Sequence, residues 1–274
     1  MNERYIFVNG AMMQANSLCI SASDLAIQRG YGIFDFLVTV NGKPIFLEDH
    51  IRRFYSSAKS MHLPVLLNQS ALIDAIEQLM QKNNLPNSGI RITLTGGDSP
   101  DGYSIGNPNL IISQTPFNYQ NQVFEKGLKL ITYEHQRQLP FIKTIDYLKA
   151  IYLQPTIKSA GADDVLYYFN GVVTECPRAN FFMVTEQNEV LTPKDNILHG
   201  VTRNKILELN GYQIKASDIS IQMLATAKEA FISSSTKNIL PVISIGNKLL
   251  GDGKPGPITR HLYQQLIQLK EISF

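Results

Sequence analysis

The sequence predicts an α/β fold with α+β character, in which two domains hold mixed, largely antiparallel sheets flanked by helices. The length of 274 residues suits two domains of ordinary size or one large α/β domain. Short apolar runs that meet at Asn-Gly turns predict hairpins in both halves, at Asn9-Gly10, Asn41-Gly42 and Asn170-Gly171. Stretches with helical spacing alternate with these hairpins, and this mixture argues against a doubly wound parallel sheet.

The first half reads as strands around two helices. Leu47-Glu48-Asp49 opens one helix, whose apolar residues from Ile51 to Met61 recur at helical spacing and predict a buried face. Ser70 is a candidate cap for a second helix. The run from Gly96 to Gly102 reads as a long flexible loop. The expected strands are residues 5–8, 34–40, 43–46, 89–95 and 110–113.

The second half has the same mixture of elements. We expect helices at 147–160, 202–210 and 259–268, and a segment at 225–231 in which a helix leads into a strand. A strand at 128–133 and hairpins at 165–175 and 181–192 complete this half. The stretch from Gln114 to Gln122 lacks periodicity. We therefore predict domains at 1–117 and 123–274, with a linker at about 114–122.

Composition excludes several classes of protein. Twenty-five Lys+Arg against 23 Asp+Glu leave a net charge of +2, which gives no electrostatic case for nucleic acid or a membrane surface. No apolar run approaches the roughly 20 residues of a membrane span, and the N-terminus does not resemble a signal peptide. Cys19 and Cys176 form no pair, and the five histidines show no metal spacing. We expect a cytoplasmic protein without a metal.

Lys143 is the first candidate for chemistry. It lies in the apolar stretch from Leu139 to Ile145, and burial would lower the pKa of its amine. A neutral amine is a nucleophile for Schiff-base chemistry. The alternative is a solvated lysine at a strand edge, and lysine is seldom fully buried.

The other candidates suit either a protonated ring nitrogen or a phosphate group. Glu175 ends a hairpin strand, where a carboxylate could hold a ring nitrogen protonated. Gly200-Val201-Thr202 starts a helix whose N–H groups could bind phosphate, and Ser233 to Thr236 offers hydroxyl and N–H groups. Arg53 adjoins the buried helix face and would need an anion. Each has a structural alternative: an exposed turn glutamate, a routine helix cap, a polar loop or a surface arginine.

In chain order these motifs resemble those of the fold type IV pyridoxal-phosphate enzymes, the class IV aminotransferases. This family includes D-amino acid and branched-chain aminotransferases and aminodeoxychorismate lyase. The resemblance covers nearly the whole chain. It rests on Gly32-Ile33-Phe34-Asp35, His50-x-x-Arg53, Lys143 to Leu148, Thr174-Glu175 with Asn180-Phe181-Phe182, Gly200-Val201-Thr202-Arg203, and Ser234-Ser235-Thr236 before Pro241.

The resemblance implies a role for each matching residue. Lys143 would bond covalently to pyridoxal 5'-phosphate and carry the proton of the substrate α-carbon. Glu175 would pair with the pyridine nitrogen, and Tyr147 with the phenolic oxygen. The phosphate group would be held by Arg53, Val201, Thr202, Ser235 and Thr236. The family also implies amino acid and 2-oxo acid substrates, ping-pong transamination, and a homodimer in which the partner subunit completes the active site.

Departures from the family concern the substrate. D-amino acid aminotransferases carry a tyrosine at the position of Phe34 and an arginine near Gly96, and both are missing here. A buried substrate carboxylate needs a charged partner, and Arg29 and Arg178 are the candidates. Arg178 could instead pair with a surface acid. Asp35 and Asp146 stand where the family often has Glu and Asn.

Three alternatives stay open at this point. Two available arginines lead us to favour D-amino acids over branched-chain L-amino acids, although Phe34 and its neighbours could line an apolar pocket. The Thr-Glu-Cys sequence at Glu175 also matches aminodeoxychorismate lyase, which would use Lys143 in the same role. A non-catalytic protein that binds pyridoxal phosphate or another phosphate would need Arg53 and Thr202, but not Lys143.

Overall fold

The computed structural model describes residues 4–17, 20–118 and 122–272, so Cys19 lies outside the described residues. The chain divides into two compact units, one of residues 1–118 with 142–146 and one of residues 119–141 with 147–274. The segment Ile142–Asp146 belongs to the first unit, although the sequence had placed it within the second domain.

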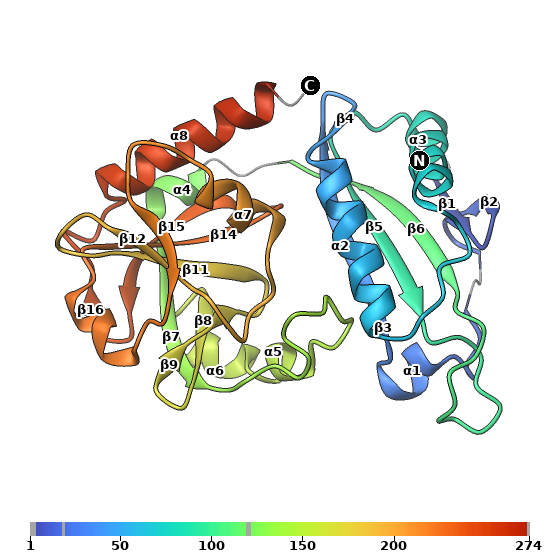
Figure 1. Cartoon of the computed structure of the whole chain (residues 1–274), viewed down its shortest axis with the longest axis horizontal. Helices are drawn as coiled ribbons and strands as arrows, with labels where there is room; N and C mark the ends of the chain where they lie inside the picture. The colour runs from blue at the N-terminus through green and yellow to red at the C-terminus, as the bar shows by residue number, and fades with distance from the viewer. Residues whose placement is uncertain (1–3, 18–19, 119–121, 273–274) are drawn as a thin grey trace. The chain divides into compact units, whose positions relative to one another are not determined.

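The first unit contains a six-stranded antiparallel sheet in the order β2-β1-β6-β5-β3-β4 (Figure 1). The predicted hairpins at Asn9-Gly10 and Asn41-Gly42 are confirmed, and all four residues have positive φ, as such tight turns require. The strands are β1 (Tyr5–Val8), β2 (Ala11–Gln14), β3 (Gly32–Val40), β4 (Lys43–Pro44), β5 (Ser88–Thr95) and β6 (Leu110–Pro116).

β6 is longer than the sequence suggested. It continues through Pro116, because Gln114 pairs with Ile90 and its buried amide donates to Ser88 Oγ at 2.8 Å. The first residues of the predicted linker are therefore strand. Residues 119–121 of that linker lie outside the described residues.

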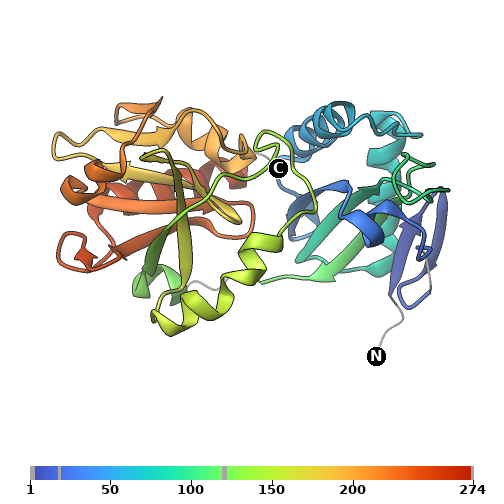
Figure 2. The same ribbon diagram turned by 90° about the horizontal axis from the view of Figure 1, so that it is seen from below.

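Two helices, α2 (Leu47–Ser60) and α3 (Gln69–Asn83), cover one face of this sheet (Figure 2). Alternation along β3 sends Ile33 and Leu37 into the same core as Phe54 of α2. The predicted buried face of α2 is confirmed. The capping residue of α3 is Asn68, whose side chain accepts from the Ala71 amide, and the prediction of Ser70 was wrong because the helix begins one residue before it.

A short helix, α1 (Leu25–Arg29), is joined to the loop that follows β5. The buried Asp24 caps α1 at the Ala26 amide and also accepts from Thr95 Oγ1 and Asn109 Nδ2. At Gly97 (φ +76°) a β-carbon would lie only 2.0 Å from the Asn107 carbonyl oxygen, so the loop passes close against itself there. The loop predicted as flexible is thus closed at its base.

The second unit contains a ten-stranded mixed sheet (Figure 1). Its main order is β13-β12-β11-β14-β15-β7-β8-β9, with β10 paired to β11 and β16 to β15. Three pairs are parallel (β12–β13, β15–β7 and β7–β8), and the others are antiparallel, which confirms the mixed, largely antiparallel prediction.

The strands of the second sheet are β7 (Leu128–Glu134), β8 (Asp164–Phe169), β9 (Val172–Val173), β10 (Glu175–Cys176), β11 (Ala179–Val184), β12 (Val190–Pro193), β13 (Ile214–Ser217), β14 (Glu229–Ser234), β15 (Asn238–Ile245) and β16 (Lys248–Leu249). β11 is buried along its whole length, since Phe181 and Met183 belong to one core and Phe182 and Val184 to another. Its continuous apolar sequence reflects a strand that is covered on both faces.

The helices of this unit are α4 (Gln122–Lys126), α5 (Leu148–Tyr152), α6 (Gln154–Ser159), α7 (Val201–Leu207), α8 (Pro257–Ile272) and the 3-10 helix η1 (Ile221–Thr226). The sequence predicted one helix at 147–160, but two short helices meet at Leu153, because Pro155 lacks the N–H that a continuous helix would use. No helix among the described residues is long and apolar enough to cross a membrane.

Candidate active site

Backbone pairing with the edge of β3 sets the position of Lys143. Residues Ile33 and Thr144 form an antiparallel bridge, the Phe34 amide donates to the Lys143 carbonyl at 3.0 Å, and the Ile145 amide donates to the Gly32 carbonyl at 3.1 Å. Gly32 has no alternative here, because a β-carbon would lie 2.9 Å from the Leu94 carbonyl oxygen. The lysine is therefore held by strand geometry rather than by a flexible loop.

The side chain of Lys143 is half-buried beside Phe34. Its Nζ lies 4.6 Å from the centroid of the Phe34 ring, within the range of a cation–π contact. Phe34 itself is only 5% exposed. The predicted catalytic lysine and the predicted substrate residue Phe34 thus lie next to each other in the first unit.

Arg91 is a further cation at the same ring, and no motif in the sequence points to it. Its guanidinium carbon lies 4.1 Å from the Phe34 centroid, because β5 pairs Arg91 with Phe36 and so places it on the same face as Phe34. The signal in the sequence was a lone charge within the apolar strand from Ile90 to Leu94. Two cations beside one aromatic ring form a surface that suits an anionic ligand.

The opposite face of β3 carries a buried ionic cluster. Asp35, with no exposed surface, accepts from Arg53 Nε at 2.8 Å, from Arg53 Nη2 at 2.9 Å and from His50 Nδ1 at 2.7 Å. Burial alone would raise the pKa of Asp35, but the charges and hydrogen bonds of Arg53 and His50 outweigh it and hold this pKa well below its usual range. The carboxyl is therefore ionised at neutral pH.

His50 is the neutral member of this cluster. Burial lowers the pKa of its imidazole, and the neighbouring cations Arg53 and Lys143 lower it further, against the opposing effect of Asp35. The ionised Asp35 assigns the ring proton to Nδ1, since a carboxylate can only accept. The approach of Arg53 Nη2 to that nitrogen at 3.3 Å is then a contact between two donors.

The cluster orients Arg53, which the sequence proposed for phosphate. Its side chain is 13% exposed, in contrast to 70% for the neighbouring Arg52. Nε and Nη2 are bonded to Asp35, whereas Nη1 makes no hydrogen bond within the described parts of the chain. Arg53 is thus held rigidly, with one nitrogen left for an anion.

In the second unit, Glu175 is buried and bonded through both carboxylate oxygens. Oε1 accepts from Arg137 Nε at 2.7 Å, and Oε2 accepts from the Leu198 amide at 3.0 Å. The exposed-turn alternative for Glu175 is therefore wrong. Arg137, 38 residues away in sequence, was not found by motif reasoning, and the only signal for it was that a buried acid needs a partner.

Asn180 joins Glu175 to the start of α7. It lies opposite Glu175 in the pairing of β10 with β11, and its Nδ2 donates to the Leu198 carbonyl at 2.7 Å. A β-carbon at Gly200 would lie 2.2 Å from Asn180 Oδ1. Gly200 is therefore needed for the close approach of this side chain, a contact that no local pattern predicts.

α7 begins at Val201, and no side chain caps its first turn. Val201 and Thr202 are both buried. The next residue, Arg203, is also buried, and donates to the Pro193 carbonyl at 2.9 Å. The arginine anchors the helix to the end of β12, so the position of the first turn is well defined.

Ser235 and Thr236 are half-buried in the turn between β14 and β15. Ser234 Oγ contacts Thr236 Oγ1 at 3.3 Å and accepts from the Lys237 amide at 3.2 Å. The predicted polar turn is thus an ordered hairpin loop whose hydroxyls are held by local bonds.

The remaining predicted site residues are Tyr147, Arg29 and Arg178. Tyr147 is half-buried directly before α5. Arg29 is exposed at the end of α1, where its Nη1 donates to the Gln28 carbonyl at 3.0 Å. Arg178 is exposed between β10 and β11, and no ion pair involving it occurs among the described residues.

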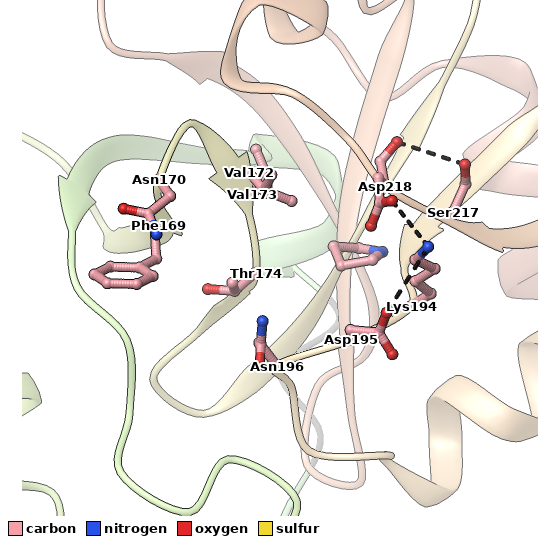
Figure 3. A pocket seen from close by; sticks show the side chains of 11 residues that line it. Phe169, Asn170, Val172, Val173, Thr174, Lys194, Asp195, Asn196, Ser217 and Asp218 are labelled. Carbon is pink, nitrogen blue, oxygen red and sulfur yellow. Dashed lines mark hydrogen bonds and ion pairs between the residues drawn. The ribbon is translucent and has the colours of Figure 1, made fainter.

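A surface pocket of about 260 Å³ lies elsewhere in the second unit (Figure 3). It is lined by the β8–β9 hairpin and the segment after β12, and its cation, Lys194, is paired with Asp218 at 2.9 Å. The residues that line it include none of the predicted site residues. Thr174 is the one lining residue that belongs to a family motif.

We expect Asp35→Asn to destabilise the protein by about 3–5 kcal/mol, because the buried Arg53 loses its anion and His50 loses the acceptor of its ring N–H. Because the pKa of Asp35 is lowered on folding, its stabilising effect is complete above the usual carboxyl pKa and is lost as pH falls below about 4. Urea unfolding from pH 7 to pH 3 measures this effect. The difference between wild type and variant should shrink at the acid end, and a constant difference would contradict the assignment.

Comparison with known proteins identifies the family. The model of amino-transferase class IV matches residues 32–245. A D-alanine aminotransferase of Bacillus licheniformis is 27% identical over 270 residues, or 95% of each chain. The branched-chain amino acid aminotransferase of Escherichia coli has the same fold, with a TM-score of 0.91, 23% identity and coverage of 98% of this chain and 95% of that one. A putative 4-amino-4-deoxychorismate lyase of Legionella pneumophila gives a TM-score of 0.84 at 26% identity, over 93% and 96% of the two chains. The chain belongs to the class IV aminotransferase family, whose members depend on pyridoxal phosphate.

Proposed function

We propose that this protein transfers the amino group of an amino acid to a 2-oxo acid by a ping-pong mechanism, with D-amino acids preferred over branched-chain L-amino acids. The observation that carries this proposal is the placement of Lys143, whose backbone is paired to β3 and whose amine lies beside Phe34. Amine transfer needs such a nucleophile in a defined position. A protein that only bound a phosphate would not need it.

The residues present fit pyridoxal 5'-phosphate. In the first unit, Arg53 Nη1 suits a phosphate group. In the second unit, the uncapped first turn of α7 and the hydroxyl groups of the β14–β15 turn do so independently. When bound, the cofactor supplies an electron-withdrawing ring. Glu175 would accept a hydrogen bond from the protonated ring nitrogen, since the ion pair with Arg137 stabilises its carboxylate form. Tyr147 would donate to the phenolic oxygen.

Lys143 would have two tasks. Its Nζ would be the nucleophile toward the aldehyde carbon of the cofactor, and the released amine would move the proton between the substrate α-carbon and the cofactor. The contact with Phe34 limits the motion of the amine, which keeps it near both positions.

The substrate carboxylate would be bound by arginine. Arg29 and Arg178 remain candidates, and Arg91 joins them because its guanidinium shares the Phe34 ring with Lys143. The similarity to a D-alanine aminotransferase over 95% of both chains supports the preference for D-amino acids. The aromatic pair Phe34 and Phe36 leaves branched-chain substrates as the competing possibility.

We also propose a homodimer. α5 has no buried residue, and its apolar side chains Leu148, Ile151 and Tyr152 are 78%, 62% and 69% exposed. Three large apolar side chains together on one short helix form the kind of surface that a second subunit covers.

A half-reaction screen tests the activity. The yellow protein reconstituted with pyridoxal 5'-phosphate should lose its long-wavelength absorbance on mixing with D-alanine, and more slowly with L-leucine. Borohydride followed by peptide mass mapping should place the cofactor on Lys143. The matched control is Lys248→Ala, an exposed lysine on β16 that should react as wild type, whereas Lys143→Ala should not be labelled. Labelling without any response to amino acids would support the non-catalytic alternative.

Aminodeoxychorismate lyase is the second candidate, because a putative member of that class shares the fold at 26% identity. The two activities differ in their products. The lyase releases pyruvate from aminodeoxychorismate without a 2-oxo acid, whereas the aminotransferase needs the acceptor in every cycle. Pyruvate release without transfer to a 2-oxo acid would refute the proposed function.

Arginine variants should separate the carboxylate candidates. Arg91→Gln should raise KM for the amino donor about tenfold or more with a smaller change in kcat, since a charge-assisted contact to the substrate is lost. Arg29→Gln and Arg178→Gln test the two residues that the sequence suggested. A variant with unchanged KM for every donor excludes its arginine.

The dimer can be tested at α5. Leu148→Glu with Ile151→Glu should convert the protein to a monomer, because two charges in an apolar interface lose their hydration. Sedimentation velocity gives the mass directly. Lys158→Glu, on the exposed side of α6, is the control and should leave the dimer intact. A monomeric wild type would contradict the proposal.

A further inference from the structure

The last helix, α8, places a lysine where its pattern calls for an apolar residue. Ile258, Leu262 and Leu266 recur every four residues and are buried against β14 and β15. Lys270 is the next member of this series and is 6% exposed. Burial of a lysine is unfavourable, and burial lowers the pKa of this amine to about 8. A buried lysine amine needs a hydrogen-bond acceptor.

The acceptor for Lys270 lies at the start of β15. Lys270 Nζ donates to Oδ1 of Asn238, a residue 32 positions earlier and itself 3% exposed. Asn238 is the first residue of β15, pairs with Ser234 and has a φ of +54°. In a three-residue hairpin loop this position is left-handed, and asparagine tolerates it better than most residues.

Between Ser234 and Asn238 the loop contains Ser235, Thr236 and Lys237. Lys237 Nζ donates to Asp164 Oδ2 of β8 at 3.2 Å, and both side chains are largely buried. The loop is therefore held at two points by lysines, one of its own toward β8 and one that reaches it from α8. Neither lysine lies in the family motifs.

We propose that Lys270 is a positioning residue, which holds the β14–β15 turn in the conformation that presents Ser235 and Thr236 to the cofactor phosphate. This inference rests on the proposed function, since it gives those two residues the phosphate as their ligand. Lys270 acts through Asn238 and the turn, and it does not touch the phosphate itself. The end of α8 thereby couples the packing of the C-terminal helix to the affinity for the cofactor.

The experiment compares two ligands on the full-length apoprotein. Pyridoxamine 5'-phosphate has no aldehyde and cannot bond to Lys143, and pyridoxamine lacks only the phosphate. Lys270→Met keeps the length of the side chain and removes the amine. It should weaken pyridoxamine 5'-phosphate about tenfold, because the turn no longer holds Ser235 and Thr236 toward the phosphate, and it should leave pyridoxamine unchanged.

Asn238→Gly gives an independent variant, because glycine keeps the left-handed backbone and removes the acceptor. It should weaken pyridoxamine 5'-phosphate to a similar degree, and the double variant should be no weaker than either single one. Lys248→Met, an exposed lysine of the same sheet, removes the same charge and should bind both ligands as wild type. The melting temperature of the apoprotein is measured for every variant.

A merely structural role predicts a different result. If Lys270→Met weakens both ligands equally, or lowers the melting temperature without a phosphate-specific loss, the inference is overturned. If Thr236→Val weakens pyridoxamine 5'-phosphate but Lys270→Met does not, the inference fails and the proposed function stands. If wild type binds the two ligands equally well, the proposed phosphate site fails, and the inference with it.

Discussion

The pairing of residues 142–146 with the edge of β3 is the contact on which the first unit's chemistry depends. Two backbone hydrogen bonds and one bridge place the Lys143 amine beside Phe34. β3 alternates its side chains, so the next residue, Asp35, points to the helix-covered face and orients Arg53. A single strand thus contacts the proposed nucleophile through Phe34 and orients the phosphate candidate through Asp35.

The candidate site of the second unit is built around buried charged side chains. Glu175 and Arg203 lie inside the protein, and each has hydrogen-bonding partners, because an unpaired charge there would be severely destabilising. The partners also connect the elements. Asn180 ties the strand after Glu175 to the segment before α7, and the absence of a side chain at Gly200 makes room for it. These contacts hold the pyridine-binding and phosphate-binding candidates in one rigid arrangement within this unit.

The lysines of the second unit differ in burial and in their hydrogen-bonding partners. Lys194 is exposed at a surface pocket and pairs with Asp218, a contact that contributes little in water. Lys237 and Lys270 are largely or fully buried and each reaches a polar group at or near the same hairpin loop. Burial makes such contacts costly to break, which is why we assign a positioning role to Lys270 and none to Lys194.

Much of this protein could be read from its sequence. Asn-Gly pairs determined three hairpins, helical spacing determined α2, and the motifs around Lys143, Glu175 and Thr202 indicated the family, since each depends on residues close together in the chain. The tertiary structure decided the rest. Arg137 beside Glu175, Arg91 beside Phe34 and Lys270 beside Asn238 are each separated by more than thirty residues. Such pairs arise only when strand register and helix packing bring distant residues together, and no local pattern encodes that proximity.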